Sequence, residues 1–507
     1  IPIMELSIFH PLNSTVCRFP GSSFFTCSLQ FTACIPLFHH ILQRVKHPLC
    51  GLAENRVLRF SRTCGKKCDK EESDVTRKEK LRRLLTGVFW ISLVCSLVFT
   101  WFYMNRAIPD KLNLVVDETE SFHFPLPVKV TLESESEEVV VGNGSNIPSD
   151  QIHLQINKPF SLYSSNEGTY HLNLKLFGII DFKDIEVDVS DTKYAIPCGM
   201  PVGIYMKSDG LMVIGTGQVE TKDGSTIDPA EGVLKSGDYI EAINGEPAHD
   251  KDDMIEAVAN AKGSPIKLDV RRDNQTMEVT MTPVETKDGD YKLGIWIRDD
   301  TQGIGTMTYV TQSGEYGALG HGISDSDTGL LVSTNGGELY DTEIMGIEKG
   351  SMGKPGVLSG VIYYGGQSKL GTIEANTEQG IFGTIDSRMW KEIDKMLGEG
   401  PGREPIPIGY RQDVKKGPAF IRSCISGEPR DYAIEIQKVD YSTAHKNKSL
   451  VIKVTDPELL SLTGGIVQGM SGSPIIQDGK LIGAVTHVFI QDSTKGYGIF
   501  IENMLEH

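Results

Sequence analysis

A serine between glycines is the part of this chain that could most directly do chemistry. Ser471 lies in the stretch Gly-Met-Ser-Gly-Ser-Pro, residues 469–474. The glycines allow a sharp loop that exposes a hydroxyl while the backbone closely approaches a substrate. We interpret Ser471 as a candidate nucleophile, and the backbone amides of Gly469 and Ser471 as candidate oxyanion donors. The alternative is a simple turn between two strands, because Gly/Ser clusters are common turn formers.

A serine nucleophile needs a base to take its proton. His321 is the first candidate, because it lies between glycines in Gly-Ala-Leu-Gly-His-Gly-Ile-Ser-Asp, residues 317–325, where an imidazole could face a cleft. His487 is the rival base. It belongs to the apolar run 481–488, which we expect to be the strand after the nucleophile loop, so that His487 would flank a substrate pocket instead.

The base in turn needs a carboxylate that holds its tautomer. The candidates are Asp325, Asp327 and Asp456. Asp325 and Asp327 closely follow His321, and we expect Asp325 to be a turn residue. Asp456 follows the strand-like residues 450–455 and precedes Ser471 by fifteen residues, so the end of a strand would hold it in place.

Composition narrows the classes of protein to consider. The chain has 507 residues and a net charge of -17, which allows about three domains and argues against a nucleic-acid binder. Cys64 and Cys68 have a loosely metal-like spacing without a matching second pair, so we predict no metal and no cofactor. Cys198 and Cys424 could pair, but nothing in the sequence requires it.

Residues 84–104 form an uncharged apolar stretch that is long enough to span a bilayer. The basic flank 66–83 precedes it and acidic residues follow, so we expect an uncleaved anchor with a cytoplasmic N-terminus and an extracytoplasmic remainder. A cleaved signal peptide is the rival, but no small-x-small site follows the apolar run. Residues 1–65 show no regular period, and we interpret them as an extension that need not belong to the mature protein.

The middle of the chain predicts two β-rich regions. Residues 107–197 alternate apolar with polar residues, as half-buried strands do, and we expect a β-rich linker region there. Residues 198–285 contain Gly-Val-Leu-Lys-Ser-Gly-Asp-Tyr-Ile-Glu-Ala-Ile-Asn-Gly, which resembles the PDZ domains of membrane-associated proteases. A PDZ groove binds an extended peptide as an added strand. We expect the groove to be bordered by Met200, Pro201, Val202, Gly203 and Ile204.

Residues 290–507 are rich in glycine and β-branched residues, a composition that suggests closed or packed β-sheets. Three of their blocks, residues 317–325, 421–460 and 463–489, closely resemble the stage IV sporulation protein B peptidases of endospore-forming Firmicutes. The resemblance implies a mainly β protein with a chymotrypsin-like double β-barrel and a triad of His321, Asp456 and Ser471. Asp456 lies closer to the serine than the aspartate of most chymotrypsin-like enzymes does.

The same resemblance implies a signalling role. A protein of this family is expected to act from the forespore membrane, in the space between the two forespore membranes. There it would cleave the extracytoplasmic part of a regulatory membrane protein, releasing an intramembrane metalloprotease that activates a late mother-cell sigma factor. Self-cleavage under control of the PDZ domain, with possible self-association, is also implied. Two alternatives are a membrane-anchored PDZ scaffold without catalysis and a periplasmic quality-control protease, although the latter places its PDZ domains after the catalytic domain.

Overall fold

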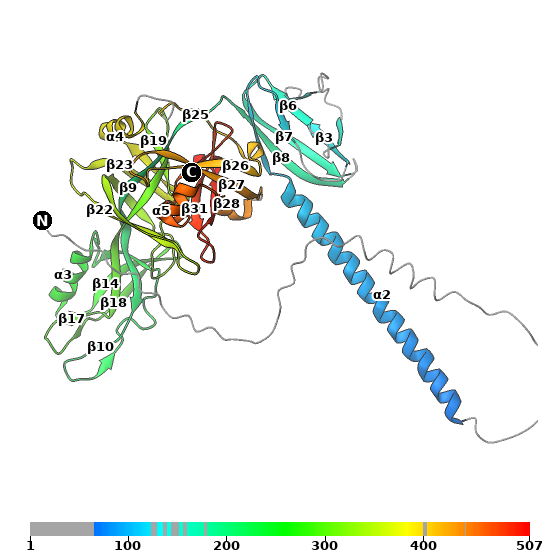
Figure 1. Ribbon diagram of the computed structural model, residues 1–507. Coiled ribbons are helices and arrows are strands. Elements are labelled where there is room, and N and C mark those ends of the chain that lie inside the picture. Colours follow the sequence, from blue (N-terminus) through cyan, green and yellow to red (C-terminus); the bar gives the residue numbers. More distant parts are fainter. Residues whose placement is uncertain are drawn as a thin grey trace, which may run out of the picture. The chain divides into compact units, whose positions relative to one another are not determined.

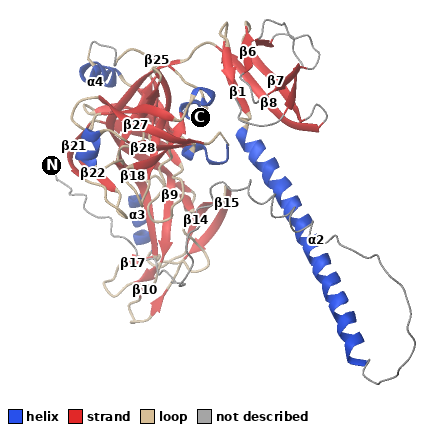
Figure 2. Cartoon of the chain, turned by 45° about the vertical axis from the view of Figure 1, so that its right-hand side comes forward, coloured by secondary structure: helices blue, strands red, loops and turns tan. Residues whose placement is uncertain are grey.

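The computed structural model describes most of the chain beyond its first 64 residues. The described residues are 65–122, 129–134, 139–142, 152–155, 160–176, 180–398, 403–441 and 443–506. The interpretation of residues 1–65 as an extension therefore falls almost wholly outside the described residues. Among those that are described, strands predominate (Figure 2), and the prediction of a mainly β protein is confirmed.

One long helix, α2 (Gly65–Ala107), covers the predicted anchor. Its segment Glu79–Asn105 is long and apolar enough to cross a membrane. The hydroxyls of Thr86 and Thr100 donate to carbonyl oxygens four residues earlier, at 2.8 Å in each case. Such bonds satisfy polar groups inside the helix itself, as an apolar environment requires.

The region predicted as a β-rich linker contains two sheets with a shared core. One sheet has the strand order β1-β8-β7-β3-β5 and the other β2-β6-β4. Apolar residues alternate along the strands, and a buried cluster that includes Leu114, Leu162 and Val187 forms the core. The strands are β1 (Lys111–Val115), β2 (Glu120–Phe122), β3 (Lys129–Ser134), β4 (Val139–Gly142), β5 (Ile152–Gln155), β6 (Phe160–Ser164), β7 (Gly168–Leu176) and β8 (Ile180–Ser190) (Figure 1).

Two unusually long strands organise the rest of the chain. β9 (Tyr194–Thr216) and β18 (Ile295–Val310) pair antiparallel from Ile196↔Val310 to Thr216↔Ile295. One half of each strand belongs to a barrel, and the other half belongs to the PDZ domain. The PDZ domain is therefore an insertion between two barrel strands.

The inserted PDZ domain has its own core, which includes Leu211, Val258 and Leu268. Asp250 caps its helix through a reciprocal capping box with Asp253. Its elements between the two long strands are β10 (Val219–Glu220), β11 (Thr226–Ile227), β12 (Tyr239–Ile243), β13 (Glu246–Pro247), α3 (Lys251–Ala261), β14 (Ile266–Arg272), β15 (Gln275–Met281), β16 (Val284–Glu285) and β17 (Tyr291–Lys292).

The first barrel is closed because β20 pairs with β9 as well as with β23. Its strands run in the order β9-β18-β19-β24-β23-β20. A hairpin is inserted between β20 and β23, and a capped helix follows β24. The elements are β19 (Glu315–Ala318), β20 (Thr334–Tyr340), β21 (Thr342–Glu348), β22 (Gly356–Ile362), β23 (Lys369–Thr377), β24 (Gly380–Ile385) and α4 (Ser387–Leu397).

The second barrel is closed by six strands in the order β26-β27-β28-β32-β31-β30. Its interior holds Ile421, Ile452 and Val485 among other buried apolar residues. The predicted double β-barrel is thus present. The elements of this part are β25 (Ile406–Pro407), η1 (Arg411–Asp413), β26 (Gly417–Ser423), β27 (Arg430–Val439), η2 (Thr443–Lys448), β28 (Leu450–Val454), α5 (Pro457–Thr463), β29 (Val467–Gln468), β30 (Pro474–Gln477), β31 (Lys480–Val488), β32 (Lys495–Phe500) and α6 (Ile501–Leu505).

The two cysteines that the sequence allowed to pair lie in this double-barrel region. Cys198, on β9, and Cys424, after β26, are both free and buried. The amide of Cys424 donates to the carbonyl of Gly199 at 3.1 Å, so this contact joins β9 to the second barrel.

Candidate active site

The nucleophile loop connects β29 to β30 and presses against the first barrel. Gly469 and Gly472 have φ values of +102° and +97°, which side chains rarely adopt. A Cβ atom on Gly472 would lie 2.0 Å from the carbonyl oxygen of Thr306. The loop therefore needs glycine both for its backbone conformation and for its close approach to β18.

Thr306 also holds the carbonyl groups of the loop. Its hydroxyl donates to the Gly469 carbonyl at 2.7 Å, and its amide donates to the Ser471 carbonyl at 3.1 Å. The amides of Met470, Gly472 and Ser473 all donate to backbone carbonyls.

The two amides that we predicted as oxyanion donors differ from their neighbours. In the described part of the chain, neither the Gly469 amide nor the Ser471 amide donates to any acceptor. Both are therefore available to a developing negative charge, which is what an oxyanion hole requires. Their catalytic role stays a prediction.

The structure brings Ser471, His321 and His487 to one region between the barrels. The Ser471 hydroxyl donates to the carbonyl of Thr486 at 2.6 Å. The His487 ring, one residue further along β31, has its centroid 4.8 Å from that of His321. No hydrogen bond between Ser471 and His321 occurs among the described residues, so the predicted role of His321 as base would require the hydroxyl to rotate away from Thr486. Catalytic hydrogen bonds are often absent until substrate is bound.

The tautomer of His321 is set by the backbone. Its Nδ1 atom lies 2.9 Å from the carbonyl oxygen of Gly322, which can only accept, so Nδ1 carries the proton of the neutral ring. The Nε2 atom is then left with the lone pair that a base needs. Burial lowers the pKa of His321, and the hydrogen bond to Gly322 acts in the opposite direction.

His487 is a poorer candidate for the base. Burial, with His321 and Lys448 nearby, lowers its pKa to about 4. Its Nδ1 atom is buried and has no hydrogen-bond partner among the described residues. It lies on β31, the second strand after the nucleophile loop, whereas the sequence had predicted the first, because the short strand β30 intervenes. A flanking role for its side chain stays a prediction.

The structure does not bring Asp456 to His321. Asp456 is the N-cap of α5, and its Oδ1 atom accepts from the amides of Glu458 and Leu459 at 2.9 and 3.1 Å. Its Oδ2 atom accepts from the amide of Ala433 at 3.3 Å. The local reason is the order Asp-Pro-Glu, since aspartate is a preferred N-cap and proline a preferred first helical residue. The membership of Asp456 in a triad remains a prediction that these contacts do not support.

The other candidate carboxylates serve a turn. Asp325 is buried, and its Oδ1 atom accepts from the amides of Asp327 and Thr328 at 3.0 and 2.8 Å. This confirms the interpretation of Asp325 as a turn residue. Asp325 and Asp327 both pair with Arg298.

The predicted border of the PDZ groove is wrong. The five residues Met200 to Ile204 lie in the barrel half of β9, where Gly203 and Ile204 pair with β18 on one side and β20 on the other. These two residues therefore have no free edge for a peptide, and Met200, Pro201 and Val202 pair with β18 within the barrel. The alternating pattern of these residues suits a barrel strand as well as a PDZ strand, and this ambiguity caused the error.

A free edge of the PDZ domain lies on β18 instead. From Ile295 to Arg298 this strand pairs with β9, and no other described strand pairs with its second edge there. Asp299 accepts from the amide of Lys251 at 3.1 Å, which ties the start of α3 to the same strand. The sequence signal that could have found this edge is the apolar run 293–297, which follows the last PDZ hairpin.

The pKa of His321 predicts how peptidase activity depends on pH. A base must be neutral, and the lowered pKa keeps His321 neutral below the usual histidine pKa of about 6.5. We expect kcat/KM to fall only as the pH drops below that value. Substituting His487→Ala should expose the His321 ring to water and move the fall to higher pH. A wild-type profile that already falls above pH ~7 would contradict this account of His321.

The double barrel and its nucleophile loop define a class, the chymotrypsin-like serine peptidases. The comparison with known families agrees: residues 289–505 match the family model of the SpoIVB peptidase S55, and residues 207–282 match that of the PDZ domain. The double-barrel part of the chain is thus similar to serine peptidases of the S55 family, and the inserted part is similar to PDZ domains.

Curated relatives match shorter segments. A protein of Clostridium perfringens assigned by name as a zinc metalloprotease, CPE1693, is 31% identical over 146 residues, which are 25% of this chain and 44% of that protein. The regulator of sigma-W protease RasP of Bacillus subtilis is 40% identical over 63 residues, 12% of this chain and 15% of that protein. The chain thus spans less than half the length of these relatives.

Among solved structures, the PDZ domain of the SdrC-like protein Lmo2051 from Listeria monocytogenes is similar to part of this chain. The identity is 24% and the TM-score 0.15, and the match covers 18% of this chain and 87% of that one.

Proposed function

We propose that this protein is a membrane-anchored endopeptidase of sporulation signalling. It cleaves the extracytoplasmic part of a regulatory membrane protein and so activates an intramembrane protease and a late mother-cell sigma factor. Support comes from the S55 family, whose name refers to a sporulation protein, and from the similarity of 63 residues to the regulator of sigma-W protease RasP. The helix α2 supplies a candidate anchor.

The proposed orientation follows from the residues around the anchor. Lysines and arginines cluster in residues 66–83, before the apolar stretch, whereas Asp110, Asp117 and Glu118 follow it. Basic residues favour the cytoplasmic side, so the barrels and the PDZ domain would lie outside the cytoplasm. In the proposed setting this is the space between the forespore membranes.

The proposed mechanism uses Ser471 as nucleophile and His321 as base. The Nε2 atom of His321 takes the hydroxyl proton as Ser471 attacks the scissile carbonyl, and the amides of Gly469 and Ser471 receive the oxyanion. Asp456 is the third triad member that the family resemblance implies. The hydrogen bond from His321 to the Gly322 carbonyl already supplies the tautomer control that this aspartate would otherwise supply.

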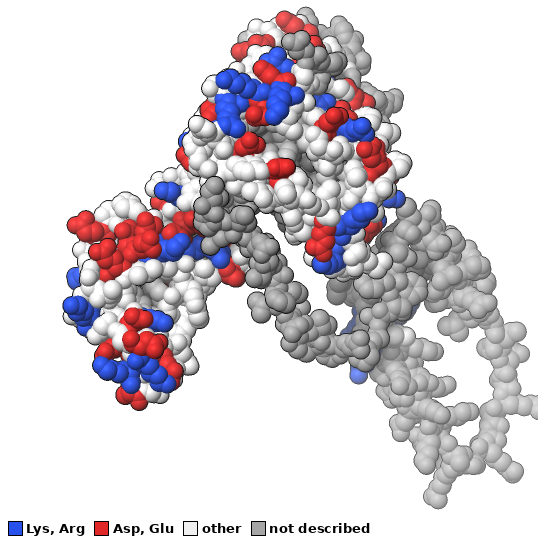
Figure 3. Space-filling view, turned by 60° about the vertical axis from the view of Figure 1, so that its left-hand side comes forward, with Lys and Arg blue, Asp and Glu red and all other residues white. Residues whose placement is uncertain are grey.

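A protein substrate fits the rest of the molecule. The free edge of β18 could accept an extended segment as an added strand. On the face drawn in Figure 3, basic and acidic side chains lie interspersed, an arrangement that does not favour a phosphate backbone. Self-cleavage, with self-association of two copies, belongs to the same proposal.

The observation that carries the proposal is the glycine-rich Ser471 loop, with two free amides, beside the neutral His321. The test is complementation of a spore-forming strain that lacks this gene, with a reporter for the late mother-cell sigma factor. We expect the wild-type chain to restore the reporter and Ser471→Ala to fail at equal protein level. Restoration by Ser471→Ala would refute a proteolytic role in this pathway. N-terminal sequencing of both proteins would show whether self-cleavage occurs and whether it needs Ser471.

A further inference from the structure

Arg298 reaches from the PDZ domain to the segment that follows His321. It lies on β18 where that strand forms the free edge of the PDZ domain. One guanidinium nitrogen pairs with Asp325, and another donates to Asp327 at 2.8 Å. The Asp325 side chain is 0% exposed, so its charge has little water around it. A buried carboxylate depends strongly on its partner, because removing one member of such a pair leaves an uncompensated charge.

Asp325 shapes the segment that it belongs to. Its carboxylate accepts from the amides of Asp327 and Thr328. Its backbone amide donates to the Leu330 carbonyl at 2.9 Å, and its backbone carbonyl accepts from the Gly329 amide at 2.8 Å. The carboxylate and the backbone of one residue therefore fold residues 325–330 into a compact turn. Arg298 neutralises the group at its centre.

The same segment makes three further contacts with the PDZ domain. The amide of Ser333 donates to the hydroxyl of Tyr239 on β12 at 3.0 Å. The carbonyl of Ser333 accepts from the amide of Asp209 on β9 at 2.9 Å. The side chain of Leu330 occupies the space where a Cβ atom on Gly237 would lie, at 2.5 Å. The segment from 324 to 333 therefore rests on the PDZ domain.

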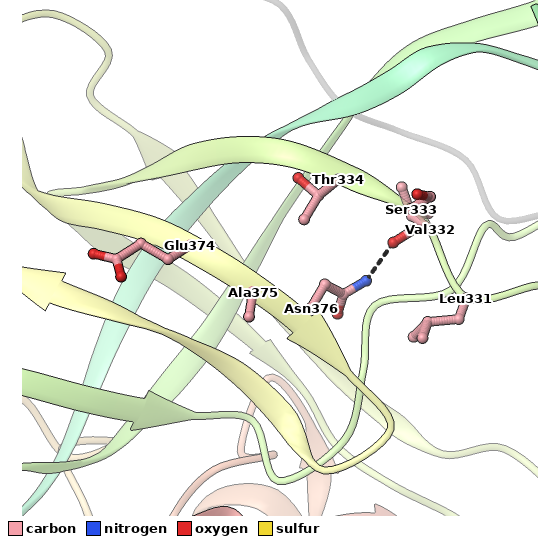
Figure 4. Close-up of a pocket in the computed structure, with 7 residues that line it drawn as sticks. All are labelled: Leu331, Val332, Ser333, Thr334, Glu374, Ala375 and Asn376. Atoms are coloured by element: carbon pink, nitrogen blue, oxygen red, sulfur yellow. Dashed lines mark hydrogen bonds between the residues drawn. The ribbon is translucent and has the colours of Figure 1, made fainter. Parts of the chain in front are cut away.

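Asn376 fixes the ends of this segment on the first barrel. Its side chain accepts from the Ile323 amide at 2.8 Å and donates to the Ile323 and Val332 carbonyls at 2.9 Å each. Figure 4 shows Asn376 pointing across the pocket to Val332, from the strand that also carries Ala375. Ile323 is only two residues from His321, so a change in the shape of the segment would reach the imidazole through a short stretch of backbone.

We propose that Arg298 and Asp325 are positioning residues for the peptidase reaction, which hold the segment after His321 in its active geometry and tie it to the edge strand of the PDZ domain. The guanidinium fork engages two carboxylates at once, and its geometry cannot be reproduced by a lysine. The ion pair thus makes the position of His321 depend on the strand that would receive a peptide. This inference rests on the proposed roles of Ser471 and His321.

The chain offers a matched control for this ion pair. Arg272 pairs with Asp238 inside the PDZ domain, where the two side chains are 23% and 0% exposed, compared with 32% and 0% for Arg298 and Asp325. Arg272 also makes two hydrogen bonds to Asp238, at 2.7 and 2.6 Å. Loss of either arginine leaves a buried carboxylate, but only Arg298 contacts the His321 segment.

The experiment compares Arg298→Met, Asp325→Asn and Arg272→Met in the full chain in detergent micelles. Two assays are used. The first measures kcat and KM on a fluorogenic peptide, and the second measures the rate at which an alkyl fluorophosphonate labels Ser471. We expect Arg298→Met and Asp325→Asn to lower kcat and the labelling rate about 10- to 100-fold with KM within about twofold, and Arg272→Met to stay near the wild type. Arg298→Lys, which keeps the charge, should recover part of the loss. The double variant should lose no more than either single one, because both remove the same interaction.

Two results would overturn the inference while leaving the proposed function intact. One is labelling of Arg298→Met and Asp325→Asn at the wild-type rate. The other is an equal loss for Arg272→Met, which would indicate general destabilisation. If Arg298→Met does not fold, Arg298→Lys is compared with Arg272→Lys. The inference then requires a lower kcat and a lower labelling rate in Arg298→Lys than in Arg272→Lys. Failure of the wild-type chain to be labelled at Ser471 would instead contradict the proposed function.

Discussion

Substituting Ser471→Ala should abolish peptide hydrolysis, with kcat lowered by about 10⁴-fold or more, because the nucleophile is removed. The fold should survive. The substitution removes one hydrogen bond, to the Thr486 carbonyl, and such a bond contributes about 1 kcal/mol to the free energy of unfolding. Hydrolysis is measured on a fluorogenic peptide, and folding by thermal unfolding.

Ser473 provides the control for this prediction. It lies two residues further along the same loop, and its hydroxyl is buried without a hydrogen-bond partner among the described residues. Since Ser473→Ala removes an unsatisfied polar group, we expect unchanged activity and equal or slightly higher stability. Equal losses of activity in Ser471→Ala and Ser473→Ala would mean that the loop, and not the Ser471 hydroxyl, is what matters.

Substituting His321→Ala should lower kcat by about 10³- to 10⁶-fold, because His487, the other histidine in this region, has a pKa lowered to about 4 and is the poorer base. Asp456→Asn should stay within about tenfold of the wild type, since the Gly322 carbonyl already sets the tautomer of His321. Asp456→Ala should instead cost about 1 kcal/mol of stability, through the loss of the N-cap of α5. The three variants are compared by steady-state kinetics and denaturant unfolding.

An Asp456→Asn variant that loses as much activity as His321→Ala would contradict this prediction. It would show that the carboxylate of Asp456 leaves the amides of Glu458 and Leu459 and turns to His321 when substrate binds. Unfolding measurements distinguish the loss of a catalytic carboxylate from the loss of helix α5. Asparagine is itself a good N-cap, so Asp456→Asn should preserve α5 and the stability of the protein.

The nucleophile loop could be predicted from the sequence because its chemistry is local. Gly469 and Gly472 stand where a side chain would clash or would strain the backbone, and the serine lies between them. The prediction for His321 was local as well, because a histidine between two glycines is poorly placed for packing and could face a cleft. Both signals depend only on residues that are neighbours in the sequence.

The strand pairings could not be predicted in the same way. Gly203 pairs with Ile304 and Tyr340, residues that are far away in the sequence, and nothing near Gly203 indicates which partner it takes. A barrel strand and a PDZ strand share the same alternation of apolar residues. The insertion of the PDZ domain between β9 and β18 therefore became visible only in the structure.

Asp456 shows a conflict between two kinds of signal. Its family position indicates catalysis, whereas its local sequence Asp-Pro-Glu indicates a helix N-cap, and the structure follows the local signal. The role of Arg298 had no local signal at all. Its importance comes from the burial of Asp325, a residue that the sequence had indicated only as part of a turn.

The most direct test of the central claim is to map the site at which an alkyl fluorophosphonate modifies the full chain. The probe reacts with an activated serine hydroxyl and loses fluoride, and digestion followed by mass spectrometry locates the adduct. We predict a single stoichiometric adduct on Ser471, which is absent when His321 is replaced by alanine. An active enzyme that carries no adduct on Ser471, or that carries it on another serine, would contradict the account.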